Sequence, residues 1–131
     1  MNYIKRNNDK IIVDNKELDM TFSRYLKHLS LCNFKTINDI RKTTKINCNI
    51  KYTMPLYINK NILLVYTGSL NSIDIIALNY FNITNIISND YSSLIIFKDG
   101  MSIKINISPH RIKTMMEKGR IVFDYVTKNN I

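Results

Sequence analysis

The chain has 131 residues, of which 45% are hydrophobic and 22% charged, and this composition excludes a disordered segment and fits one folded domain. Nineteen Lys and Arg residues stand against ten Asp and Glu residues, giving a formal net charge of +9. Such a small basic domain favours a polyanionic partner, nucleic acid before an anionic membrane, over a protein whose charge serves only solubility.

The positive charge is unevenly distributed along the chain. Residues 24–60 contain eight basic residues and one acid, Asp39, whereas residues 61–97 contain no Lys or Arg. After residue 97 the chain again has seven basic residues against three acids. This segregation predicts a binding surface built mainly from the first basic stretch. Its basic residues are Arg24, Lys27, Lys35, Arg41, Lys42, Lys45, Lys51 and Lys60.

The cysteines and the apolar runs indicate the cellular compartment in which the protein is expected. Cys32 and Cys48 are too few for a disulfide framework and match no metal-ligand spacing, so we expect each to be a small buried residue in a reducing compartment. Met1 leads into charged residues without the apolar run of a signal peptide. The apolar runs Ile62–Tyr66 and Leu94–Phe97 are far too short to cross a bilayer. We therefore expect a cytoplasmic protein without a metal, another cofactor or a membrane partner.

The N-terminal residues predict a hairpin followed by a helix. Tyr3–Lys5 and Ile11–Val13 flank a polar turn, a pattern that is typical of a β-hairpin. From Thr21 to Leu31 the apolar residues recur at helical spacing with basic residues between them. Either Thr21 or Asp19 is suited to be the N-cap of this helix.

The middle of the chain predicts a short basic helix and two strands. Thr36 and Asp39 have the form of a capping box, which predicts a second helix over residues 37–46. Pro55 ends any helix before it and favours extended geometry. Two strands are expected beyond it, at residues 56–58 and 62–67.

The second half predicts further strands and a C-terminal helix. Residues 77–87 are mostly apolar and predict one or two strands, and Asp99-Gly100 joins residues 94–97 to 101–107 in a β-hairpin. Ser108 followed by Pro109 begins a helix, in which Gly119 is expected to be a weak point. The prediction is a single α+β domain, a mostly antiparallel sheet with two short helices in the first half and a C-terminal helix packing on the sheet.

Residues that commonly carry catalysis are scarce. His28 and His110 are the only histidines, and neither lies at ligand spacing from a cysteine or carboxylate. The three glycines are too far apart for a phosphate-binding loop, and no carboxylate pair suits a two-metal site. We therefore expect that the protein is not an enzyme.

Several stretches, in order, resemble the ComK family, the competence transcription factors of low-GC Gram-positive bacteria. Residues 26–32 resemble the family's helix that ends in a cysteine, and Arg41 falls where the family has a Gly-Arg pair in a short basic helix. Residues 51–58 resemble a Lys-x-Pro-(Ile/Leu) strand, and residues 62–69 an apolar strand closing on Thr-x-Ser. Residues 94–107 resemble a Phe-x-(Asn/Asp)-Gly hairpin, followed by a helix that a serine initiates.

The chain also departs from this family. Ile40 replaces the glycine of Gly-Arg, and Ala77-Leu78-Asn79 stands where the family often has a tryptophan. The family's longer C-terminal tail has no counterpart here. The likeness therefore bears more on the fold, a ComK-like domain over residues 1–131, than on self-assembly or on turnover controlled by an adaptor protein.

The resemblance implies a regulator that binds double-stranded A/T-rich DNA in the minor groove, usually as a homo-oligomer. The narrow minor groove of A/T tracts is strongly negative and attracts Arg and Lys side chains, which the basic stretch supplies. We expect DNA contacts from the short helix and the residue beyond it, with backbone contacts from the preceding basic residues and a second patch at the last helix. These residues are, in that order, Arg41, Lys42, Lys45 and Lys51; Arg24, Lys27 and Lys35; and Arg111 and Lys113.

Other classes of function stay open on the sequence alone. One is a small regulatory protein that binds a protein partner, such as an adaptor, and never contacts DNA. Another is an enzyme acting on nucleic acid. A peripheral membrane protein is a more distant alternative, because no expected helix combines a basic face with a broad aromatic one.

Overall fold

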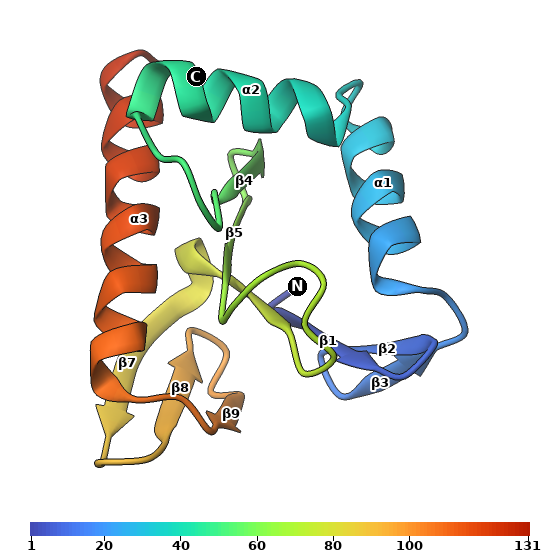
Figure 1. Ribbon diagram of the computed structural model, residues 1–131, viewed down its shortest axis with the longest axis vertical. Helices are drawn as coiled ribbons and strands as arrows, with labels where there is room; N and C mark the ends of the chain where they lie inside the picture. Colours follow the sequence, from blue (N-terminus) through green and yellow to red (C-terminus); the bar gives the residue numbers. More distant parts are fainter.

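Two antiparallel sheets and three α-helices make up the fold in the computed structural model, which describes residues 1–131 (Figure 1). The helices are α1 (Phe22–Cys32), α2 (Ile37–Cys48) and α3 (Pro109–Lys128). The strands are β1 (Tyr3–Asn7), β2 (Lys10–Val13), β3 (Lys16–Leu18), β4 (Leu56–Asn59), β5 (Ile62–Tyr66), β6 (Ile76–Asn79), β7 (Ile83–Ser88), β8 (Ser93–Phe97) and β9 (Ser102–Ile105).

The larger sheet separates two layers of other elements. Its strand order is β3-β2-β1-β6-β5-β4, and the smaller sheet has the order β7-β8-β9, with every neighbouring pair antiparallel. Helices α1 and α2 lie on one side of the larger sheet, whereas α3 and the smaller sheet lie on the other (Figure 1). The predicted single α+β domain with a C-terminal helix packed on the sheet is therefore confirmed.

Strand β5 is apolar throughout because both of its faces are covered. Leu64 and Tyr66 belong to the core beneath α1 and α2, whereas Leu63 and Val65 pack on the opposite side with residues of α3. Successive side chains of a strand point to opposite faces, so one short run supplies both cores. The loop that follows β5 therefore begins between α1 and α2 on one side of the larger sheet and α3 on the other.

Each helix begins at the cap that its sequence provides. The side chains of Thr21, Thr36 and Ser108 accept hydrogen bonds from backbone amides in the first turns of α1, α2 and α3. Thr21 is thus the cap of α1, and Asp19 is not. Helix α2 extends two residues beyond the predicted end and stops at Asn49, whose φ of 54° is a left-handed conformation that asparagine tolerates.

The predicted strands are also confirmed. Both expected hairpins form, the first from β1 and β2 and the second from β8 and β9. The apolar stretch of residues 77–87 forms two strands, β6 and β7, which are separated by the short 3₁₀ helix η1 (Tyr80–Asn82). That break moves the chain from the larger to the smaller sheet, a division that the alternation of residues did not indicate.

The prediction that both cysteines are buried is wrong for Cys32. This residue is exposed, because it ends α1 on the side away from the helix's buried residues. Its Sγ lies 3.6 Å from Nε2 of His28, one helical turn earlier, so the expectation that no histidine lies at ligand spacing from a cysteine is also wrong. Cys48 is half-buried, and burial raises the pKa of its thiol.

Gly119 is a packing position and not the predicted weak point. Helix α3 runs without interruption through it, and the glycine is buried. A Cβ atom placed there would lie 2.5 Å from Cδ2 of Tyr80 and 3.0 Å from Cγ1 of Val65. The missing side chain therefore allows the close approach of α3 to β5 and η1.

Candidate nucleic-acid interface

Two adjoining cavities lie at the end of β5, between α2 and α3. The first, of about 440 Å³, is lined by Arg41, residues 51–54, Tyr66 and residues 69–71. The second, of about 280 Å³, is lined by Thr53, by residues 66–68 and by five residues of α3: His110, Arg111, Thr114, Met115 and Lys118. Because Thr53 and Tyr66 belong to both linings, the cavities share a wall.

A third cavity, of about 160 Å³, continues this surface toward β1 and β9. It shares residues 67–68 and Arg111 with the second cavity and adds Lys5, Lys104 and the acid Asp74. We call the cationic residues and the histidine of the three linings the basic face. Its members are Lys5, Arg41, Lys51, Lys104, His110, Arg111 and Lys118.

Hydrogen bonds to carbonyl groups hold the loops of this surface in place. The Arg111 guanidinium donates to the carbonyl of Thr67, which fixes the start of α3 to the end of β5. Lys118 donates to the carbonyl of Tyr52 at 2.7 Å and to the hydroxyl of Thr53, and burial lowers the pKa of its ammonium group. These two cations connect α3 to both loops that line the cavities.

Arg6, near the end of β1, also holds the loop that follows β5. Arg6 donates to the carbonyls of Leu70 and Ser72 at 2.9 and 2.6 Å, and its guanidinium lies 5.1 Å from the ring centre of Phe22. Hydrogen bonds from a charged donor to buried carbonyls contribute more than neutral ones. The loop is thus anchored by Arg6 on one side and Arg111 on the other.

Few of the cations are neutralised by acids within the protein. Of the 19 Lys and Arg residues, only Lys10 and Arg120 form ion pairs with carboxylates. The linings of the first two cavities contain no Asp or Glu. Arg41 and Lys51 therefore have no neutralising carboxylate in their cavity, and such positive charges attract anions over distances of about 10 Å at moderate salt.

The structure brings together some of the predicted contact residues. Arg41 and Lys51 line one cavity with no acid between them, and Arg111 lines the next. Lys42 and Lys45 are exposed on α2 beside Arg41, one turn or less away. Lys51 and Arg111 are 60 positions apart in the sequence, so the two basic stretches contribute to one surface.

The other predicted contact residues lie elsewhere. Arg24 and Lys27 are exposed on α1 and line none of these cavities. Lys113 is exposed on α3 but points about 160° away from Arg111, since successive helical residues are about 100° apart. Lys35 also lines none of these three cavities; its ammonium donates to the carbonyl of Ile58 at 2.9 Å and lies 5.0 Å from the ring centre of Tyr57.

Sequence reasoning missed several members of the basic face. His110 and Lys118 lie eight positions apart on α3, a spacing that returns to the same side of a helix, so periodicity gave a signal for them. Lys5 and Lys104 come from strands whose positions follow only from the sheet topology. Tyr66 was assigned to an apolar strand, and nothing in the pattern indicated that it lines two cavities with cationic residues.

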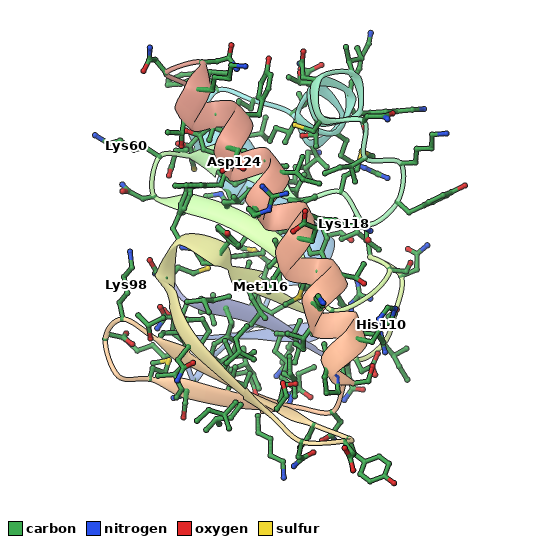
Figure 2. All side chains as sticks on the ribbon, turned by 90° about the vertical axis from the view of Figure 1, so that its left-hand side faces the viewer. Lys60, Lys98, His110, Met116, Lys118 and Asp124 are labelled. Atoms are coloured by element: carbon green, nitrogen blue, oxygen red, sulfur yellow. The ribbon has the colours of Figure 1, made fainter.

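A second surface lies on the opposite side of α3. It is a groove of about 880 Å³ whose walls include the aromatic residues Tyr57, Tyr80, Phe81 and Phe123 and the basic residues Lys60 and Lys98. Figure 2 shows His110 and Lys118 on one flank of α3, and Lys60 and Lys98 on the other. The basic face and the aromatic groove are therefore separate surfaces of the molecule.

Comparisons of the chain with known protein families, with curated proteins and with solved structures found no match. None of the three helices has the length and apolar character required to span a membrane. No three or more His, Cys, Asp and Glu side chains gather in a cluster that would hold a metal ion.

Proposed function

We propose that the protein is a DNA-binding regulator of transcription that contacts double-stranded DNA through the basic face and the adjoining residues of α2. One observation carries this proposal: Arg41 and Lys51 of the first basic stretch meet Arg111 and Lys118 of the last helix around cavities that contain no acid. Scattered surface lysines would serve solubility equally well, whereas a continuous cationic surface suits a polyanion.

Two kinds of contact follow from the positions of these cations. Lys42 and Lys45 are exposed on α2 and suit contacts with phosphate groups, whose contribution falls steeply with salt. Arg41 is exposed on the same helix, and an arginine side chain that enters a narrow A/T-rich minor groove responds to its shape and negative potential. We therefore expect a preference for A/T-rich duplexes.

The resemblance to the ComK family supports a regulatory role and implies self-assembly on DNA and a protein adaptor as further partners. A second candidate function is binding of a protein partner without DNA. The aromatic groove favours it, because aromatic side chains are enriched at protein interfaces. The two functions use different surfaces, so variants of each surface distinguish them.

Fluorescence anisotropy with an A/T-tract duplex and a G/C-rich duplex of equal length tests the proposal at two salt concentrations. We expect tighter binding to the A/T duplex, and we expect this preference to persist at the higher salt. Replacement of Arg41, Lys42 and Lys45 by alanine is expected to weaken binding by about tenfold or more, because three cationic contacts are removed together.

Replacement of Arg24, Lys27 and Lys113 by alanine is the matched control, since it removes the same charge from exposed residues that neither line the cavities nor belong to α2. Equal losses in the two triple variants would show that only net charge matters. Absence of binding to either duplex at low salt would contradict the proposal and favour the protein-partner function.

A further inference from the structure

The side chain of Tyr66 carries a buried polar group beside the first two cavities. The Tyr66 side chain is 5% exposed, and its hydroxyl oxygen is the one buried side-chain oxygen or nitrogen of the protein without a hydrogen-bond partner. A buried polar group left without a partner is costly, and native proteins rarely keep one. Tyr66 lies in the wall shared by the first two cavities.

The two charged side chains of the first cavity are hydrogen-bond donors only. Arg41 and Lys51 line the same cavity and form no ion pair, and neither side chain has an acceptor atom. Burial raises the pKa of Tyr66 far above its usual range, so the phenol keeps its proton and can donate it. The Arg41 charge opposes this rise, which places the guanidinium within electrostatic reach of the phenol. What the lining of this cavity lacks is a negatively charged acceptor.

We propose that the cavity between α2 and the loop after β5 is a binding site for one phosphate group, held by Arg41, Lys51 and the hydroxyl of Tyr66. Phosphate oxygens accept from guanidinium, ammonium and phenol donors alike. The lining contains no carboxylate that would repel the ligand. At about 440 Å³ the cavity has room for a phosphate ester as well as for free phosphate.

The phosphate group has two possible sources with the same chemistry. One is the backbone of DNA, in which case this site is the anchoring contact of the proposed function and rests on it. The other is a small phosphorylated molecule that binds independently of DNA. Inorganic phosphate represents the chemistry shared by both, and a DNA-binding measurement separates them.

Thermal unfolding, followed by circular dichroism in phosphate and in chloride at equal ionic strength, tests the site. We expect phosphate at several times its dissociation constant to raise Tm of the wild-type protein by about 2–4 °C relative to chloride. Tyr66→Phe keeps the ring and removes only the hydroxyl, so it is expected to lose most of this rise and to bind phosphate about tenfold more weakly. In chloride its Tm is expected to equal or exceed that of the wild type, because the variant has no unpartnered hydroxyl.

Tyr91→Phe is the matched control, since Tyr91 is 85% exposed and lies outside the cavity. It is expected to keep the full phosphate effect. An equal Tm of the wild type in phosphate and chloride would overturn the inference, and so would an undiminished phosphate effect in Tyr66→Phe.

The same proteins are then titrated with the A/T duplex. Weaker duplex binding by Tyr66→Phe supports DNA as the source of the phosphate. A phosphate effect together with no duplex binding by the wild type supports the site with a small phosphorylated ligand and contradicts the proposed function. Duplex binding without any phosphate effect leaves the proposed function intact and overturns the site.

Discussion

Replacement of Gly119 by valine is expected to destabilise the protein by about 3 kcal/mol or more, a large part of the stability of a small domain. Even a single Cβ atom would lie 2.5 and 2.9 Å from ring atoms of Tyr80 and 3.0 Å from Val65. The ring of Tyr80 packs against Phe81 and Phe123, so it has little freedom to move aside. Urea denaturation measures the change as a lower midpoint with an unchanged slope.

Lys113→Val is the matched control for this variant. It introduces the same β-branched residue into the same helix at an exposed position, where the cost is about 0.5 kcal/mol from helix propensity alone. A Gly119→Val midpoint equal to that of the control would show that α3 does not depend on close approach to β5. Because α3 carries Arg111 and Lys118, that result would also show that close packing of Gly119 is not needed to hold these two cations in the basic face.

Reversing the charge of both Arg41 and Lys51 to glutamate is expected to lower affinity for the A/T duplex by about 100-fold at moderate salt. Each reversal removes a cation and adds an anion at the edge of one cavity, so the effect exceeds that of alanine. The dependence of affinity on salt is expected to become shallower by about two phosphate contacts. Anisotropy titrations over a series of salt concentrations measure both changes.

The chain offers a control with the same change in net charge. Lys60→Glu with Lys98→Glu reverses two cations beside the aromatic groove, on the opposite flank of α3 (Figure 2). If the basic face binds DNA, this pair weakens binding by less than tenfold. A larger loss from the Lys60 and Lys98 pair than from the Arg41 and Lys51 pair would place the DNA contact on the groove instead.

Local signals in the sequence predicted most of the elements. Thr36 and Ser108 cap their helices, and Asp99-Gly100 forms the expected hairpin turn, because these features depend on neighbouring residues alone. At η1 the chain passes from one sheet to the other. This change depends on the pairing of strands that are distant in sequence, so no local pattern predicted it. Gly119 was misjudged for the same reason, since its role is a contact with residues far away in sequence.

The residues of the candidate site likewise divide into those that local patterns predicted and those that they did not. Charge segregation pointed to Arg41 and Lys51, and helix-start chemistry pointed to the region of Arg111. Lys35 donates a hydrogen bond to the carbonyl of Ile58, and the spacing of residues along the sequence does not predict this contact. The lack of a hydrogen-bond partner for the Tyr66 hydroxyl likewise depends on the three-dimensional arrangement of the residues around it.

A two-dimensional ¹H–¹⁵N NMR titration of the protein with the A/T duplex tests whether residues distant in sequence bind DNA as one surface. We expect the largest chemical-shift changes at residues 41–54, 66–71 and 110–118, the segments that line the first two cavities. Residues near Lys60, Lys98 and Phe123 in the aromatic groove are expected to change little. Chemical-shift changes concentrated in the groove, or confined to one basic segment, would show that the basic face does not bind DNA as one surface.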